Sequence, residues 1–323
     1  MNDKPDLPQE DESLAKDTKN DKQGLEAPKE GLATLIGKDI SVLVKQFGQP
    51  ERIDPSDYGY DWWIYKQDLS HYMQVGVHNQ RVVTLYAIGS DVDVSPFSIG
   101  QSIDEIYSDI SYEPEVNLEY EGSSYRFELT ENDMNSRPLI PMGEFFAQIN
   151  VDKFDGTISS IRFMDTETLL KLQPYELVYL GTLLEPSPTG EDEQARISEG
   201  NAKQILDITN IMRIRHHLKP LDWDEKLTEV ALAHSVDMYE NDDFSHTSKV
   251  NGELADRLEA GDVFYQLAGE NIAANYADAP AVMEGWLNSK GHRETLLNSE
   301  FTHLGVGVYK RHYTQNFIQK WAE

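Results

Sequence analysis

The chain has 323 residues, about two domains' worth, and 39% of them are hydrophobic, which is enough for a sizeable core. It carries 28 basic and 57 acidic side chains, a net charge of −29. A surface this acidic repels phosphate groups, which argues against a nucleic-acid partner and against docking by charge on anionic lipid. The sequence contains no cysteine, which excludes disulfides, thiolate metal sites and cysteine nucleophiles, and no apolar run approaches the ~20 residues of a transmembrane helix.

Residues 1–30 are predicted to form a disordered tail or spacer. They include nine acidic residues, five lysines and three prolines but no aromatic residue, so they cannot bury enough apolar surface to offset chain entropy. The basic start and apolar core of a signal peptide are missing. Either the protein is cytosolic, or the sequence begins after a removed export signal or anchor. The polar, proline-bearing spacer favours the second alternative, an extracellular or cell-surface-anchored protein.

Residues 31–184 repeat a pattern. A glycine followed by apolar residues at helical spacing occurs at residues 37–47 and again 63 residues later, and alternating strands follow in both copies. Later strands match at offsets of 74 and 76, so the second copy contains about eleven additional residues, placed within 132–141. The pattern predicts one α+β domain of two tandem helix-plus-meander units. Its residues form no catalytic constellation, which favours a binding or regulatory module.

Residues 185–200 are polar and proline-bearing, and they are predicted to be a linker. In the second domain, residues 201–323, helices are predicted over residues 202–218 and 279–289. A further helix is predicted to start at Asp222, with Glu225 as the capping-box partner of that residue. Residues 304–309 and 312–320 alternate as two antiparallel strands. These elements predict helices around a small sheet in three layers.

Several polar residues of this domain are candidates for a site. His234 lies inside the apolar stripe of the second helix and is interpreted as a packed histidine. His246, Glu270 and His312 lie in separate loop or strand segments, and their spacing alone does not establish that they converge. The metalloprotease motif H-E-x-x-H, the nucleophile motif G-x-S-x-G and phosphate loops are absent.

Five motifs follow one another over about residues 200–323. They are Phe244-Ser-His246, Gly269-Glu-Asn-Ile-Ala273, residues 285–293 (GWLNSKGHR), Leu304-Gly-Val-Gly-Val308 and His312-Tyr-Thr-Gln315. In these motifs and their order, the second domain resembles the CAP superfamily, which comprises cysteine-rich secretory proteins, antigen-five allergens, plant pathogenesis-related proteins and many bacterial extracellular proteins. The repeated domain resembles the CAP-associated amino-terminal domain that precedes such modules in Gram-positive bacteria.

The resemblance implies an α/β/α sandwich with a cleft of two histidines and two glutamates, which binds a divalent metal in some members. Carried over by motif, the cleft residues are His246, Glu270 and His312. Ser289 stands where the second glutamate is expected, and His292, one turn further on, is expected to face the cleft. The loss of a carboxylate lowers the expected affinity for hard cations. Two imidazoles and one carboxylate still suit zinc or another divalent cation, with the fourth position open to water.

Three functions remain open. The first is a binding or signalling module of the cell envelope that recognises an unidentified ligand or protein through the His/Glu cleft without turnover. The second is a zinc-dependent hydrolase at the envelope, which needs a separate general base that the sequence does not identify. In the third, the polar cluster only ties loops together. Binding is favoured, because the resemblance does not imply enzymatic activity as a shared property of the family.

Overall fold

The computed structural model describes residues 9–10, 24–109 and 113–321. The chain divides into two compact units: unit 1 comprises residues 1–53, 58–66 and 71–187, and unit 2 comprises residues 54–57, 67–70 and 188–323. The division after residue 187 falls inside the segment predicted as a linker. No helix in the described ranges is both long enough and apolar enough to cross a membrane.

Most of the predicted tail, residues 1–30, lies outside the described residues. Residues 24–30 are described, and for them the prediction of disorder is wrong. The backbone N–H of Leu25 donates to the carbonyl of Pro141 over 2.8 Å, and Leu25 packs against the core of unit 1. A single partly buried leucine held by one backbone hydrogen bond can order a short segment, which a composition averaged over thirty residues does not reveal.

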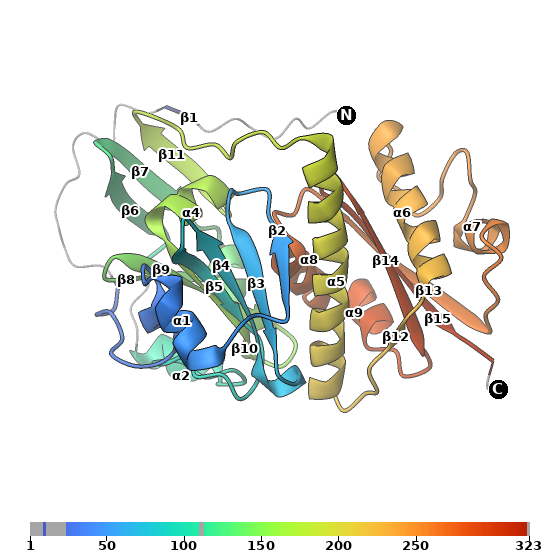
Figure 1. Ribbon diagram of the computed structural model, residues 1–323, viewed down its shortest axis with the longest axis horizontal. Coiled ribbons are helices and arrows are strands. Elements are labelled where there is room, and N and C mark those ends of the chain that lie inside the picture. Colours follow the sequence, from blue (N-terminus) through green and yellow to red (C-terminus); the bar gives the residue numbers. More distant parts are fainter. Residues whose placement is uncertain (1–8, 11–23, 110–112, 322–323) are drawn as a thin grey trace. The chain divides into compact units, whose positions relative to one another are not determined.

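Unit 1 contains two sheets and several short helices (Figure 1). The larger sheet has the strand order β2-β3-β4-β5-β10-β9-β8, and the smaller has the order β1-β11-β7-β6. The strands are β1 (Gln9–Glu10), β2 (Arg52–Pro55), β3 (Asp61–Lys66), β4 (Tyr72–His78), β5 (Arg81–Ala87), β6 (Glu115–Tyr120), β7 (Ser123–Glu128), β8 (Leu139–Met142), β9 (Phe145–Asp152), β10 (Thr157–Asp165) and β11 (Glu176–Leu180). The helices are η2 (Leu32–Leu35), α1 (Ile40–Phe47), α2 (Ile103–Asp109), α3 (Glu131–Ser136) and α4 (Thr166–Leu172), and the short η3 (Leu69–His71) precedes β4.

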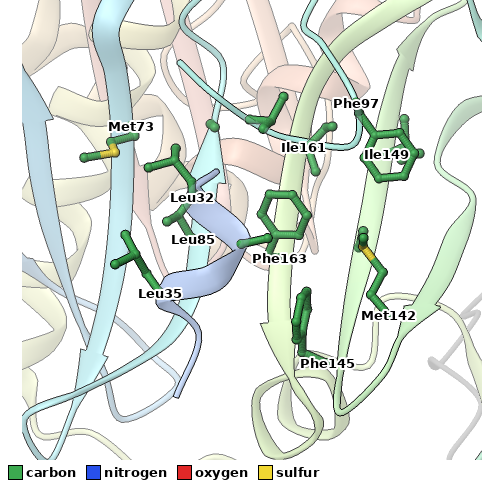
Figure 2. Packing of buried hydrophobic residues seen from close by; sticks show 14 of the residues in the cluster. Leu32, Leu35, Met73, Leu85, Phe97, Met142, Phe145, Ile149, Ile161 and Phe163 are labelled. Atoms are coloured by element: carbon green, nitrogen blue, oxygen red, sulfur yellow. The ribbon is translucent and has the colours of Figure 1, made fainter. Parts of the chain in front are cut away.

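One face of the larger sheet carries the core of unit 1. Ile161 and Phe163 are fully buried and project from the same face of β10, because side chains two residues apart point the same way along a strand. Figure 2 shows Leu32 and Leu35, from η2, packed over strands that carry Leu85 and Phe163. The segment directly before the first predicted repeat helix therefore covers the core.

The two predicted repeat copies make equivalent backbone contacts. In the first copy, the N–H of Gly37 donates to Val82 over 2.7 Å, and in the second the N–H of Gly100 donates to Ile158 over 2.9 Å. Both glycines have positive φ angles, 77° and 86°, a conformation that other residues rarely adopt. The additional residues of the second copy supply β8, which lies beside β9 as β3 lies beside β4. The strand predicted as the counterpart of β3 belongs instead to β7 of the smaller sheet.

Unit 2 is a three-layer sandwich around a sheet of order β12-β14-β15-β13 (Figure 1). The hydroxyl of Ser235 donates to the hydroxyl of Thr314 over 2.8 Å. Gln315, the residue after Thr314 in the same strand, donates to the hydroxyl of Thr209 over 2.7 Å. Because neighbouring strand residues point to opposite faces, the helices of Ser235 and Thr209 cover opposite faces of the sheet. The elements are α5 (Glu191–Arg215), β12 (Asp222–Trp223), α6 (Glu225–Glu240), α7 (Leu254–Ala260), β13 (Leu267–Ala274), α8 (Ala279–Leu287), α9 (Lys290–Leu296), β14 (His303–Tyr309) and β15 (His312–Gln319).

Two helix starts differ from the prediction. Helix α5 begins at Glu191, so the second part of the predicted linker, residues 191–200, is helical. Three acidic residues in its first turn complement the positive end of the helix dipole, and Ile197 is buried. Helix α6 is capped by Asp224, whose carboxylate accepts from the N–H of Leu227, and not by Asp222, which lies in β12.

Candidate ligand-binding site

Glu270 is the centre of a buried polar cluster in unit 2. It lies in β13 directly opposite Asn316 of β15, and cross-strand partners project from the same face. That face is the one covered by α6, because Thr314, two residues before Asn316, bonds to Ser235. The Glu270 side chain is only 3% exposed. A carboxylate in this position requires charged or hydrogen-bonding partners.

Arg257 of α7 provides the charge that balances Glu270. Its Nη2 lies 2.6 Å from Glu270 Oε2, and the arginine side chain is itself 5% exposed. Its Nη1 lies 2.5 Å from Nδ1 of His234, which projects from α6. A guanidinium only donates hydrogen bonds, so His234 Nδ1 is the acceptor and the proton of the neutral imidazole is on Nε2. The interpretation of His234 as a packed histidine with one hydrogen bond therefore agrees with its burial and with its contact to Arg257.

The pKa of His234 is lowered from its usual value. Burial is the largest cause, because an apolar environment disfavours the imidazolium, and the nearby charge of Arg257 acts in the same direction. The charge of Glu270 opposes the shift. The ring is therefore held in the neutral form that can accept a hydrogen bond from Arg257.

His246 forms the solvent-facing side of the cluster. Its Nδ1 lies 2.9 Å from Glu270 Oε1, whereas 56% of its side chain is exposed. Because the carboxylate accepts, Nδ1 donates and Nε2 remains the nitrogen open to a ligand. The structure thus brings together His246 and Glu270, as the sequence predicts.

His292 of α9 also lies near this side of the cluster. Its backbone carbonyl accepts from the amide of Asn271, the residue after Glu270, over 3.2 Å. Burial lowers the pKa of His292, and the charge on His246 lowers it further. Ser289 is the N-cap residue of α9, where its side chain makes no capping hydrogen bond.

The prediction that His312 joins His246 and Glu270 is wrong. His312 begins β15 and pairs with Ala274, four residues along β13 from Glu270, which corresponds to about 13 Å along the strand. Its ring packs edge-on against Tyr239, with ring centroids 5.6 Å apart. His312 is the first residue of β15, four residues before Asn316, the residue that faces Glu270.

The predicted zinc donor set therefore does not fit the structure. One of its three residues is elsewhere, and both oxygens of Glu270 already contact positively charged or donating groups. The buried guanidinium of Arg257 beside the carboxylate opposes a second cation. The arrangement is better suited to a ligand that donates a hydrogen bond, since it exposes the acceptor Nε2 of His246 beside the Arg257–Glu270 pair.

A polar side chain beside Glu270 has unused hydrogen-bonding capacity. Asn316 is fully buried, and neither its amide nor its carbonyl has a hydrogen-bond partner among the described residues. The Nε of Arg257 is also unpartnered there. Such buried groups normally bond to ordered water or to a ligand.

The sequence motifs do not mark Arg257 as a site residue, although its position on a helix face indicates that it is buried. Leu254, Arg257 and Leu258 are spaced three and four residues apart, so the arginine shares a helix face with two leucines. His234 likewise shares a helix face with apolar side chains in α6. Two basic side chains on apolar faces indicate a buried acidic partner.

Comparison with known families agrees with this architecture. Residues 36–175 match the CAP-associated N-terminal family, and residues 206–321 match the Cysteine-rich secretory protein family. The chain is 51% identical over 294 residues to the Uncharacterized membrane protein YlbC of Bacillus subtilis (strain 168), a match that spans 91% of this chain and 85% of the relative. It is 40% identical over 120 residues to the Uncharacterized protein YkwD of the same organism, spanning 36% of this chain and 47% of the relative.

Two solved structures share the fold over nearly the whole chain. An extracellular protein containing a SCP domain from Bacillus anthracis str. Ames has 45% identity and a TM-score of 0.87, covering 94% of this chain and 99% of its own. A cysteine-rich secretory protein from Staphylococcus aureus subsp. aureus Mu50 has 32% identity and a TM-score of 0.82, covering 92% and 98%. The chain therefore belongs to the cysteine-rich secretory protein (CAP) family, with a CAP-associated N-terminal domain ahead of its CAP domain.

Proposed function

We propose that this protein acts outside the cell or anchored at the cell surface, as a binding or signalling module of the envelope that recognises its ligand through the cluster around Glu270. The similar protein from B. anthracis is described as extracellular, which supports the location. The observation that carries the proposal is the pairing of a 3% exposed carboxylate with a buried arginine on one side and an exposed histidine on the other.

This arrangement favours recognition without turnover. The carboxylate of Glu270 is occupied by Arg257 and His246, so it is not free to act as a general base. The unpartnered groups of Asn316 and Arg257 offer hydrogen bonds to a polar ligand group. The loop that holds His246 also exposes the apolar side chains of Phe244 and Val250, which can contact an apolar part of the same ligand.

The alternative of a zinc-dependent hydrolase has less support. It relied on His312 as the second imidazole, and that residue pairs with Ala274 instead. Metal analysis and zinc titration distinguish the two functions. We expect the parent protein and the His312→Ala variant to behave alike. Tight zinc binding by the parent that is lost in both His246→Ala and His312→Ala would contradict the proposal.

Co-sedimentation with isolated Gram-positive cell envelopes tests the binding function directly. We expect the parent protein to sediment with the envelopes and His246→Ala to remain in solution, because His246 is exposed and its loss leaves the core intact. His312→Ala is the matched control and should sediment like the parent. Equal sedimentation of all three proteins, or release of soluble envelope fragments by the parent, would overturn the proposal.

A further inference from the structure

A second concave surface lies on unit 2, outside the Glu270 cluster. It encloses about 330 Å³, within the usual range for small-molecule sites. Three segments far apart in sequence form it: the start of α6, the loop between α7 and β13, and the chain directly after β15. Its polar and aromatic lining residues are Asp224, Lys226, Asp262, Phe264, Lys320 and Trp321.

The two aromatic side chains are unusually exposed. Phe264 is 80% exposed and Trp321 is 66% exposed, and neither ring contacts another aromatic ring among the described residues. Single exposed apolar side chains need no explanation, but two large rings that line one pocket form a patch of the kind that marks a binding surface.

The loop that carries Phe264 is anchored to the core of unit 2. Val263 lies between Asp262 and Phe264 and is buried in a small core with Leu227, Val230, Leu258 and Ile318. Its N–H donates to the carbonyl of Leu258 over 2.9 Å, which closes the end of α7. The ring of Phe264 is therefore presented to solvent by a loop whose neighbouring residue is anchored.

The segment that carries Trp321, on the opposite side of the pocket, is also fixed by hydrogen bonds and an ion pair. Lys320 Nζ lies 2.6 Å from the carboxylate of Asp224, and the N–H of Lys320 donates to the hydroxyl of Thr302 over 3.1 Å. Asp224 in turn caps α6. These contacts fix the backbone directly before Trp321.

The charges of the lining limit the ligand class. Two carboxylates and two ammonium groups line the pocket, so its formal charge is zero in a chain of net charge −29. A fatty chain would cover the carboxylate of Asp262 and the ammonium of Lys226, which lie outside the Asp224–Lys320 ion pair, without offering them hydrogen bonds. The lysines oppose a metal cation, and the carboxylates oppose a strongly anionic ligand.

We propose that this pocket binds a neutral oligosaccharide. Pyranose rings have apolar C–H faces that stack on aromatic rings, as Phe264 and Trp321 offer, and hydroxyl groups that both donate and accept hydrogen bonds. The carboxylate of Asp262 accepts from such hydroxyls and the ammonium of Lys226 donates to them. A neutral, amphipathic ligand of this kind satisfies both the aromatic and the charged parts of the lining.

The test is titration of the full chain with three neutral trisaccharides, chitotriose, cellotriose and maltotriose, followed by calorimetry or NMR. We expect at least one to bind with a dissociation constant of about 1 mM or lower. Phe264→Ala and Trp321→Ala should each weaken that binding about tenfold, the loss expected for one stacking contact. Both side chains are largely exposed, so the unfolding temperature should not change.

Phe154→Ala is the matched control, because Phe154 is a half-exposed phenylalanine of unit 1 outside the pocket. It should bind the trisaccharide like the parent, and so should His246→Ala, which separates this site from the Glu270 cluster. No binding by any of the three sugars up to about 10 mM would overturn the proposal. Equal binding by the parent and by Trp321→Ala would overturn it as well.

Discussion

At the scale of single residues, the Arg257–Glu270 pair decides the stability of the candidate site. Both side chains are nearly inaccessible, so removing one leaves an uncompensated buried charge. We expect Arg257→Met to lower the free energy of unfolding by about 3–5 kcal/mol, measured by denaturant titration. The double variant Arg257→Met, Glu270→Gln should lose less than the sum of the two single losses. Additive losses would mean that the pair is not coupled.

An exposed pair provides the comparison for this measurement. Lys203 and Glu199 form an i,i+4 pair on α5, with side chains 45% and 65% exposed. Lys203→Met removes a positive charge from a salt bridge just as Arg257→Met does. Because water screens the exposed pair, the change should stay below about 1 kcal/mol.

His234 should make the stability of unit 2 depend on pH. Its pKa is lowered in the folded state, so unfolding takes up a proton once the pH falls below the unfolded value of about 6.5. The stability contributed by the neutral ring is present above that pH and is lost as the pH decreases towards the folded pKa. His234→Asn retains an acceptor for Arg257 but cannot titrate.

We therefore expect the unfolding temperature of the parent protein to decrease more steeply than that of His234→Asn between pH 7.5 and pH 5. Thermal unfolding followed by circular dichroism measures both curves. His292 and His303, whose pKa values are also lowered, remain in both proteins, so only the difference between the curves reports on His234. Parallel curves would contradict the prediction, because they would mean that the pKa of His234 is the same in the folded and unfolded states.

At the scale of elements, the packing of α6 on β14 depends on two glycines. A Cβ at Gly307 would overlap the backbone of Ala231 and Leu232, and one at Gly305 would overlap the backbone of Leu227 and Thr228. The sequence Gly305-Val-Gly307 thus lets the helix lie directly on the strand, with Ser235 donating to the carbonyl of Gly307. The same approach places His234 next to the sheet.

We expect Gly307→Ala to destabilise unit 2 by about 3 kcal/mol or more, because backbone atoms must move to make room. Denaturant unfolding measures the effect. Gly291→Ala in α9 is the control, since a Cβ there meets nothing within 4 Å and alanine favours a helix. A tolerated Gly307→Ala would show that α6 can shift without cost.

The elements of the fold were more predictable than the register that builds the site. Helical spacing and ordered motifs predicted the sandwich, and the resemblance carried by those motifs implied that His246 and Glu270 share a cleft. The position of His312 depends on the β14–β15 turn, where Lys310 and Arg311 adopt positive φ angles that their side chains do not indicate. The register of β13 against β15 pairs Glu270 with Asn316 and places His312 opposite Ala274.

At the scale of the whole molecule, the acidic side chains are unevenly distributed between residues 1–200 and residues 201–323. Residues 1–200 contain 16 basic and 38 acidic side chains, whereas residues 201–323 contain 12 and 19. Both proposed sites lie in the less acidic part, where single basic residues such as Arg257 and Lys226 can balance nearby carboxylates. The strongly acidic part repels anionic surfaces and takes no part in either proposed site.

The two units should also behave as separate folding domains joined by a short segment. Residues 181–190 have no helix or strand among them, whereas α5 starts at Glu191 and buries Ile197 within its second turn. Proteases cut exposed, irregular backbone first. We therefore expect limited digestion with a protease of broad specificity to cleave within 181–190 and to spare 191–200, leaving a carboxy-terminal fragment that retains cooperative unfolding. Mass spectrometry of the first fragments locates the cut. Early cleavage inside 191–200 would mean that the start of α5 unwinds readily in solution, and a fragment without cooperative unfolding would show that unit 2 depends on unit 1 for its fold.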